Sequence, residues 1–548
     1  MVRKFLASMQ REVRGLHEAA YVLAVFTFLS QVLALIRDRV FAHFFGAGAF
    51  LDAYFAAFRI PDISFAVLTL FASSFALVPL ITERGGAGTK EARTLLSGVF
   101  VVFGVVSVVA SAALWFLLPT LLPLIVPGFS DEVRATTLEL SRIMLLQPIL
   151  LGISTIASSV MQASRKFFLY ALAPIFYNVG IIVGALFLYP TLGSVGLAWG
   201  VVLGASLHLL VQATPFITSP QGLHVSRSLV RDMTKIMFLS APRALALSSQ
   251  QFLFIAFAVA ASVTAAGSVA VVSFAWNLQS VPLAIIGVSY ASALFPSLSA
   301  LFVAGNRETF VREMWIAVRH MLMWTMLAIA LMIVLRAHIV RVILGTGAFT
   351  WSDTRLTAAV LAGFVISLAA QAALLIFSRA YYAAGKSLTP IAINVGAAVL
   401  AGVFGLVATS WFQTATTTRY FFEGLFKIGG IAGSDMLILA LTYSAVMVAS
   451  ALVFAIHAAK TFGFEPKTIQ SLSYSFAASV LAAAGCYATL RLFGPLLPTD
   501  TFFGILAQGV SGGVVGLLVW AGTLSLLKSK EFSEVISVLV KMRKPSVS

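Results

Sequence analysis

Long apolar stretches recur along almost the whole chain, and short polar segments separate them. A helix needs about 20 apolar residues to cross the hydrocarbon core of a bilayer, and the pattern predicts fourteen such segments. The predicted spans are residues 22–45, 52–82, 94–117, 135–161, 167–189, 193–216, 235–263, 267–303, 313–335, 356–382, 387–409, 436–459, 468–492 and 502–527. The chain is therefore predicted to be an all-α polytopic membrane protein, and its eighth span is long enough to be tilted or to continue into the cytoplasm.

Composition agrees with this pattern and excludes a soluble globular protein. The chain is 60% hydrophobic and only 10% charged, whereas about a quarter of the residues in soluble domains are charged. The single cysteine, Cys486, lies in a predicted span and cannot form an intramolecular disulfide.

The net charge of +16 has a one-sided distribution. Most of the 36 lysines and arginines lie in the two terminal segments and in the even-numbered loops. This distribution follows the positive-inside rule and predicts that both termini are cytoplasmic. The basic surface is expected to face anionic lipid headgroups rather than nucleic acid. Residues 1–20 are predicted to form an amphipathic cytoplasmic segment, and residues 528–548 a basic cytoplasmic tail.

Two short motifs indicate an internal duplication. The sequence PIFYNVG begins at Pro174, and PIAINVG begins at Pro390, 216 residues later. Pro79 and Pro296 are 217 residues apart, a nearly equal offset. Six spans separate the copies, so the halves are expected to be parallel repeats with a substrate site between them. Prolines at matching places also predict bent helices in both halves.

The duplication predicts the organisation of the chain. We expect an N-terminal lobe of spans 1–6 and a C-terminal lobe of spans 7–12, with spans 13 and 14 outside the repeat. The predicted boundaries are 21–225 for the first lobe, 226–435 for the main part of the second, 436–465 for its twelfth span, and 466–527 for spans 13 and 14.

Ionisable groups cluster around the turn between the first two predicted spans. A charge in hydrocarbon costs at least ~2.5 kcal/mol and normally faces a bundle interior or water. The cluster is expected at the outward ends of both spans, and it consists of Arg37, Asp38, Arg39, Asp52, Arg59 and Asp62. It is either a neutral ion network that joins two helices or a gate in which one arginine binds an anionic substrate group.

Pairing between nearby charges is expected at several of the intramembrane arginines. Arg59 and Asp62 are one helical turn apart and can pair, and Pro61 between them prevents a regular first turn. Arg142, in the fourth span, is expected to pair with Glu139. Arg243 has no nearby acid in sequence, which favours contact with an anion or with water, or a side chain that extends to the cytoplasmic headgroups.

Amide side chains form a second group of candidates within the spans. Single amides in membrane helices usually join helices through hydrogen bonds, but a ring of them could bind sugar or peptide groups. The interhelical role is favoured for the matched pair Asn178 and Asn394. Both roles stay open for Asn277 and Gln279, which lie in the eighth span.

No catalytic motif accompanies these candidates. The sequence has no nucleotide-binding loop, nucleophile elbow or metal-ligand spacing, so a transporter is expected rather than an enzyme, with no cofactor. Transport would then depend on an ion gradient, the membrane potential or a substrate gradient, and a coupling cation cannot be named.

Five segments together resemble the MurJ/MviN family of lipid II flippases, within the multidrug/oligosaccharidyl-lipid/polysaccharide exporter superfamily. These are SQVLALIRDRVFAHFFGAGAFLDAYFAAFRIPD, APIFYNVGIIVGALF, GSVAVVSFAWNLQSVPLAIIGVSYASALFPSLS, VRVILGTGAFTWSDTRL and SRAYYAAGKSLTP, in the order of the family. The resemblance implies two six-helix lobes around a cationic cavity, and two further helices with a groove for a lipid tail. It implies outward movement of an undecaprenyl-pyrophosphate-linked peptidoglycan precursor by alternating access. Ser30, Arg37, Asp38 and Asp52 match family positions.

The sequence departs from the family pattern at several cavity positions. A usual arginine is replaced by Gln31, an arginine-rich turn by Phe65 and Ala66, a glutamate by Leu70, and an Asp-Arg pair by Trp276 and Asn277. Arg37 with Arg243 could replace these charges. The alternatives are a polysaccharide-repeat flippase, a cation-coupled drug exporter or a non-transporting paralogue.

The resemblance also implies partners and a location. A lipid II flippase would act as a monomer on an undecaprenyl-linked lipid in the bacterial cytoplasmic membrane, within peptidoglycan biosynthesis and cell-shape maintenance. The residues expected to bind substrate or to gate its passage are Ser30, Gln31, Arg37, Asp38, Asp52, Arg59, Asp62, Arg243, Asn277 and Gln279. Those expected to shape or pack helices are Pro61, Pro79, Pro174, Asn178, Pro296, Pro390 and Asn394.

Overall fold

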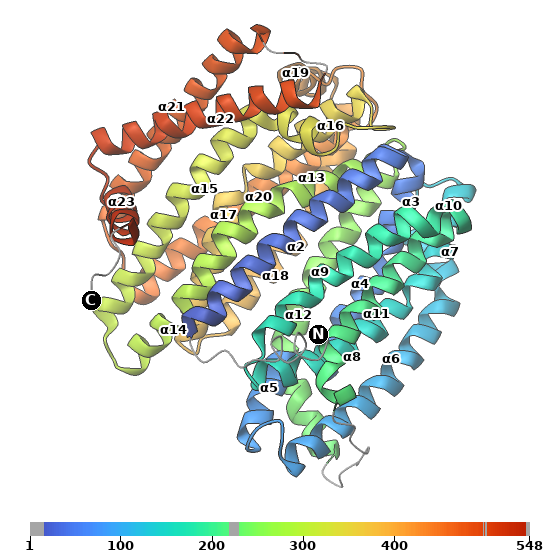
Figure 1. The fold of residues 1–548 in the computed structure, drawn as a ribbon. Helices are drawn as coiled ribbons and strands as arrows, with labels where there is room; N and C mark the ends of the chain where they lie inside the picture. The colour runs from blue at the N-terminus through green and yellow to red at the C-terminus, as the bar shows by residue number, and fades with distance from the viewer. Residues whose placement is uncertain (1–15, 219–228, 497, 499–500, 544–548) are drawn as a thin grey trace. The chain divides into compact units, whose positions relative to one another are not determined.

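The structure confirms the all-α class. The computed structural model describes residues 16–218, 229–496, 498 and 501–543, and this part of the chain contains helices and no strand (Figure 1). Thirteen of its helices are long and apolar enough to cross a membrane, and they correspond to every predicted span except the first. The first predicted span lies within helix α2 (Leu16–Phe45), which is not one of these thirteen. The total of fourteen spans is therefore not confirmed.

Parts of the two predicted terminal segments lie outside the described residues. These are residues 1–15 of the N-terminal segment and 544–548 of the basic tail. The remainder of that tail contains helix α23 (Lys530–Arg543).

The chain divides into two compact units, Met1–Ala270 and Val271–Ser548. Helix α12 (Leu229–Ser262) packs against α4 (Arg59–Ala72) and α6 (Lys90–Ile125), so it belongs to the first unit. The compact units therefore differ from the predicted lobes in the place of α12, and the lobe boundaries stay a prediction.

The first unit contains the helices that carry most of the candidate residues. Beyond α2, α4, α6 and α12, its elements are α3 (Ala49–Ala57), α5 (Ser74–Glu83), α7 (Asp131–Met144), α8 (Leu146–Ala163), α9 (Phe167–Val183), the π-helical η1 (Gly184–Leu188), α10 (Tyr189–Leu192) and α11 (Ser194–Thr218). Helix α9 packs against both α2 and α11, which lie beside it in Figure 1.

Helices α9 and α11 touch through their backbones. A Cβ atom added at Gly180 would lie 2.3 Å from the Cα of Gly204, and one added at Gly184, in η1, would lie 2.4 Å from the Cα of Gly200. Real Cβ atoms essentially never come this close to another heavy atom. The absence of side chains at these glycines is therefore what brings the two helices together.

The second predicted span is interrupted twice. Helix α3 ends before α4 near Pro61, which has no N–H to donate to the carbonyl of Ala57. The hydroxyl of Ser141 on α7 donates to that carbonyl instead, at 3.1 Å. The second interruption is at Ser73, whose backbone is extended (ψ 127°).

The predicted bend is thus present, but the second break falls at a serine rather than at a proline. The hydroxyl of Ser159 on α8 donates to that of Ser74 at 3.0 Å, beside the break. Pro79 lies inside α5, and its counterpart in the repeat, Pro296, lies inside α14 (Ser289–Val303).

The second unit contains the remaining helices. Besides α14, these are α13 (Ser268–Pro282, which begins in the first unit), the π-helical η2 (Leu283–Val288), α15 (Arg307–Ile343), α16 (Trp351–Val365), α17 (Leu368–Ala383), α18 (Leu388–Thr414), α19 (Thr416–Phe426), α20 (Asp435–Phe462), α21 (Lys467–Phe493), the 3-10 helix η3 (Gly494–Leu496), α22 (Phe502–Leu526) and α23.

Helices α21 and α22, outside the repeat, pack against each other and along α15 (Figure 1). Their core includes Met323 of α15, Ala482 of α21, Trp520 of α22 and Phe532 of α23. The two terminal spans are thus joined to the second unit through its longest helix.

Candidate functional site

Arg37 is held by a polar network between α2 and α9. Its Nε and Nη2 donate to Oδ1 of Asp38 at 3.0 and 2.8 Å, and its Nη1 donates to Oδ1 of Asn178 at 3.1 Å. The Nδ2 of Asn178 lies 3.4 Å from the hydroxyl of Ser30. Asp38 is only 1% exposed. At this point an ion pair on α2 and an amide of α9 connect the two helices, and the choice between a neutral network and a gate stays a prediction.

Asp52 stabilises the start of another helix. Its Oδ2 accepts the N–H of Gly267 at 2.6 Å, and its Oδ1 accepts that of Ala270 at 2.8 Å. These amides open α13 and need an acceptor, and a negative charge is favourable at a helix N-terminus. Gly267 has a φ of +91° and lies so close to Ala47 that a Cβ would be 2.0 Å from its carbonyl oxygen. Within the first unit, Asp52 therefore joins the turn after α2 to the turn after α12.

Arg59 and Asp62 do not form the expected direct ion pair, because no nitrogen–oxygen contact within 4.0 Å joins them in the described part of the chain. The guanidinium of Arg59 lies over the ring of Phe254 on α12, 5.3 Å from its centroid. Asp62 accepts a long hydrogen bond of 3.4 Å from Gln147 on α8. The Nε of Arg59 is buried and has no hydrogen-bond partner among the residues that the structure describes.

Arg142 and Arg243, which also lie in predicted spans, differ from each other. Arg142 stacks over the ring of Trp115 at 4.2 Å, and within the described ranges it has no ion pair with Glu139, so the predicted pairing is wrong. Arg243 is exposed on α12. Its side chain has no hydrogen bond or ion pair with any other described residue, which makes it the more accessible cation for an external anion.

The two copies of the repeat make the same local hydrogen bond. The Nδ2 of Asn178 donates to the carbonyl of Pro174 at 3.1 Å, and that of Asn394 donates to the carbonyl of Pro390 at 2.8 Å. Each amide also reaches a serine, and Asn394 lies 3.1 Å from Ser378 on α17. The motifs therefore build equivalent structures within their own units, in agreement with an interhelical role.

One amide of the eighth span, Gln279, is more buried than a substrate-binding role would favour. Gln279 is buried, and its Oε1 accepts a hydrogen bond from Gln371 on α17 at 3.2 Å. Gln371 also donates to Ser367 at 2.8 Å. Asn277 and Gln31 are partly buried. These contacts favour helix packing for Gln279.

The sequence analysis missed a buried ion network on the first half of α15. Arg319 donates to Glu465 at 2.6 Å and to Glu531 on α23 at 2.8 Å, and His320 lies 2.9 Å from Glu534. Burial raises the pKa of Glu531, but hydrogen bonds from its own backbone, Ser471 and Ser529 and the charge of Arg319 hold that pKa below its usual range. The sequence feature that could have indicated this network is Arg319 next to His320 inside an apolar segment.

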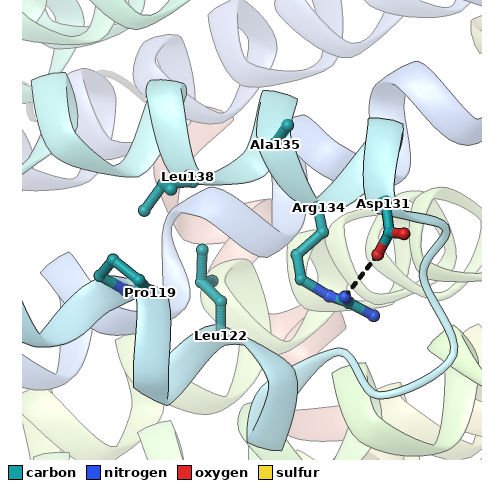
Figure 2. Close-up of a pocket in the computed structure, with 6 residues that line it drawn as sticks. All are labelled: Pro119, Leu122, Asp131, Arg134, Ala135 and Leu138. Atoms are coloured by element: carbon teal, nitrogen blue, oxygen red, sulfur yellow. Dashed lines mark hydrogen bonds and ion pairs between the residues drawn. The ribbon is translucent and has the colours of Figure 1, made fainter.

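A small hollow lies between the end of α6 and the start of α7 (Figure 2). It has a volume of about 210 Å³ and is lined by Pro119, Leu122, Asp131, Arg134, Ala135 and Leu138. Figure 2 shows its charged groups paired, with Arg134 donating to Asp131 at 2.9 Å. Ligand sites usually have volumes of about 300–1,000 Å³, so this hollow is too small for a lipid-linked precursor.

The described residues also contain no group of three or more His, Cys, Asp or Glu that could hold a metal ion.

Comparison with known families identifies the group to which this sequence belongs. The model of the family described as "Lipid II flippase MurJ" matches residues 41–503, which include Asp52, Arg59 and both copies of the motif that begins at Pro174 and Pro390. The chain belongs to the MurJ family. It is therefore a multi-pass membrane protein of a transporter family rather than an enzyme.

Curated members of the MurJ family are similar over most of their length. The lipid II flippase MurJ of Burkholderia cenocepacia is 28% identical over 405 residues, which cover 70% of this chain and 77% of the relative. The probable lipid II flippase MurJ of Haemophilus influenzae is 29% identical over 415 residues, which cover 70% and 79%.

Solved structures show the same fold. A lipid II flippase MurJ in an inward closed conformation matches with a TM-score of 0.73 and 23% identity, over 92% of this chain and 99% of that one. An inward-facing multidrug resistance MATE family transporter of the MOP superfamily matches with a TM-score of 0.61 and 17% identity, over 79% and 96%. The fold of this MurJ family member is therefore that of MOP superfamily transporters.

Proposed function

We propose that this protein moves lipid II, an undecaprenyl-pyrophosphate-linked cell-wall precursor, across the bacterial cytoplasmic membrane by alternating access. The match of the MurJ family model to residues 41–503 carries the proposal. The fold shared with MOP superfamily transporters agrees with the mechanism.

A pyrophosphate requires cations, and the first unit offers two candidates with different surroundings. Arg37 is neutralised by Asp38 and also donates to Asn178, so binding an anion through Arg37 requires exchange of an existing hydrogen bond. Arg243 is exposed and has no such bond to exchange among the described residues. We therefore assign first contact with the pyrophosphate to Arg243, and a later, more buried contact to Arg37.

The test is replacement of these cations in cells depleted of their own lipid II flippase. A hydrogen bond to a charged group contributes about 1.5–3 kcal/mol, and 1.4 kcal/mol corresponds to a factor of about ten. Arg243→Ala should therefore lower lipid II translocation at least roughly tenfold at normal expression. Arg134→Ala, which removes a cation paired to Asp131, is the matched control and should keep full activity.

Arg37 needs a milder change because Arg37→Ala would remove the ion pair that Arg37 makes with the buried Asp38, and breaking a buried ion pair is strongly destabilising. Arg37→Lys keeps the charge and removes the two-pronged geometry. Its activity should fall while expression and folding are kept. Full activity in an Arg37→Lys/Arg243→Ala double variant would remove the case for pyrophosphate recognition.

The orientation and assembly follow from the same proposal. Both termini are cytoplasmic because the basic residues concentrate in the terminal segments and the even-numbered loops. The protein acts as a monomer, uses no cofactor and draws on an ion gradient, the membrane potential or a substrate gradient. Its physiological role is in peptidoglycan biosynthesis.

A further inference from the structure

Helix α19 occupies an unusual place in the second unit. It connects α18 to α20, which are both long and apolar enough to span a membrane. Its 11 residues extend about 16 Å at 1.5 Å per residue, too short for a hydrocarbon core of about 30 Å. Chain connectivity therefore places α19 at the level where two membrane spans end. Figure 1 labels it near α16 in the same unit.

The outer face of α19 is apolar. Thr417, Tyr420, Phe421, Gly424 and Leu425 are exposed, and their spacing of three and four residues puts them on one side of the helix. Tyr420 is 76% exposed, Phe421 65% and Leu425 60%. Below, this face is called the α19 stripe.

The inner face of α19 carries the charges. Glu423 is 5% exposed, and it accepts hydrogen bonds from Nε of Arg419 at 2.8 Å and from the hydroxyl of Ser434 at 2.6 Å. Burial raises the pKa of Glu423, but the hydrogen bonds from Arg419 and Ser434 outweigh burial and hold it below the usual value. A surface helix of a soluble protein has the opposite arrangement, with its apolar side toward the core. The environment outside α19 is therefore apolar.

The exposed surface of α18 identifies that environment as lipid. Val399, Val403, Phe404 and Val407 are exposed along one side of this membrane span, and Trp411 is exposed near its end. Aromatic residues are enriched where spans meet the membrane–water interface. The α19 stripe follows Trp411 along the chain, and Lys427 is exposed directly after the helix, where it can meet lipid phosphates.

We propose that α19 is an interfacial helix whose stripe, Tyr420, Phe421 and Leu425 above all, inserts into the lipid leaflet in which α18 ends and α20 begins. Glu423 faces the protein and neutralises Arg419, whose side chain is 36% exposed, and the aromatic side chains take the depth at which headgroups meet acyl chains. The helix thereby fixes the depth of the α18–α20 connection in the bilayer.

Spin labels on the stripe test this placement. The full-length protein would be studied in nanodiscs of phosphatidylethanolamine and phosphatidylglycerol, with the buried native Cys486 replaced by serine. A Cβ added at Gly424 meets no atom within 4 Å, so Gly424→Cys carries the label without disturbing the fold. Thr417→Cys is a second position on the stripe.

Two reference positions give the accessibility ratios expected for a label in lipid and for a label in water. Val403→Cys marks the lipid-facing side of α18, and Gly88→Cys, whose Cβ also meets nothing within 4 Å, marks a loop in water. The ratio of accessibility to oxygen over accessibility to a water-soluble nickel chelate should be several-fold higher at Gly424 than at Gly88, and lower than at Val403.

Two results would overturn the proposal. A ratio at Gly424 equal to that at Gly88 means that the stripe is in water. Protection from both reagents, or dipolar broadening between labels on different molecules, means that a protein surface or a second copy of the chain covers the stripe.

Discussion

Replacing Gly180 by alanine should destabilise the first unit, because its Cβ would fall on the backbone of α11. The added atom would lie 2.3 Å from both the Cα and the N of Gly204. Ordinary van der Waals contact begins at 3.4 Å, so the helices must separate by roughly 1 Å. Backbone atoms cannot move aside as the end of a flexible side chain can.

The magnitude follows from two opposing effects. Added methyl groups in a packed interior typically cost about 1–3 kcal/mol. Alanine favours a helix over glycine by up to about 1 kcal/mol. Because the contacts at Gly184 and Gly200 continue the same interface, separation of the helices would loosen several turns. Full offset leaves about 0–2 kcal/mol, and this loosening places the net loss in the upper half of that range, at about 1–2 kcal/mol.

The repeat supplies a matched control for this change. Gly396 occupies the same place in PIAINVG as Gly180 in PIFYNVG, but a Cβ there meets nothing within 4 Å. Gly396→Ala should leave stability unchanged or raise it through helix propensity. Apparent melting temperatures of both variants in the same detergent measure the difference. Equal stability of Gly180→Ala and wild type, or equal losses in the two variants, would refute the reasoning.

Two further changes test buried carboxylates. Asp52→Ala should remove the acceptor for the Gly267 and Ala270 amides and lower the free energy of unfolding by about 2 kcal/mol. The melting temperature should fall, and amide hydrogen exchange at the start of α13 should become faster. Unchanged exchange there would contradict the capping role of Asp52. The pKa of Glu531 is lowered in the folded protein, below the ordinary glutamate value of about 4.3. The ionised Glu531 therefore stabilises the fold at neutral pH, and this stabilisation is lost as the pH falls through the folded-state pKa. The wild-type melting temperature should therefore fall on acidification more steeply than that of Glu531→Gln, and parallel curves would show that the contact with Arg319 contributes nothing.

Hydrophobic periodicity predicted the helices well because each membrane span must satisfy its backbone within itself. Thirteen spans follow from local composition alone. The repeat was visible because Pro174 and Asn178 recur as Pro390 and Asn394 in one short motif, and each pair makes its hydrogen bond within a single turn.

Partners distant in the sequence could not be predicted in this way. Arg142 was expected to pair with Glu139 one turn away, yet it stacks on Trp115 of another helix. The backbone amides that donate hydrogen bonds to Asp52 lie more than two hundred residues further along the chain. Which neighbour a polar side chain meets depends on helix packing, and a hydropathy pattern contains no information on that packing.

The cap that Asp52 provides has a consequence for biogenesis. Its partner amide at Gly267 is synthesised 215 residues later, which at 5–20 residues per second is on the order of 10–40 s of translation. Throughout that interval, several spans enter the membrane while the carboxylate has neither of its amide donors. Because a charge without hydrogen-bond donors is costly in hydrocarbon, Asp52 must stay in contact with water until these amides are present. Asp52 therefore forms its final hydrogen bonds late, only after the turn before α13 has been synthesised.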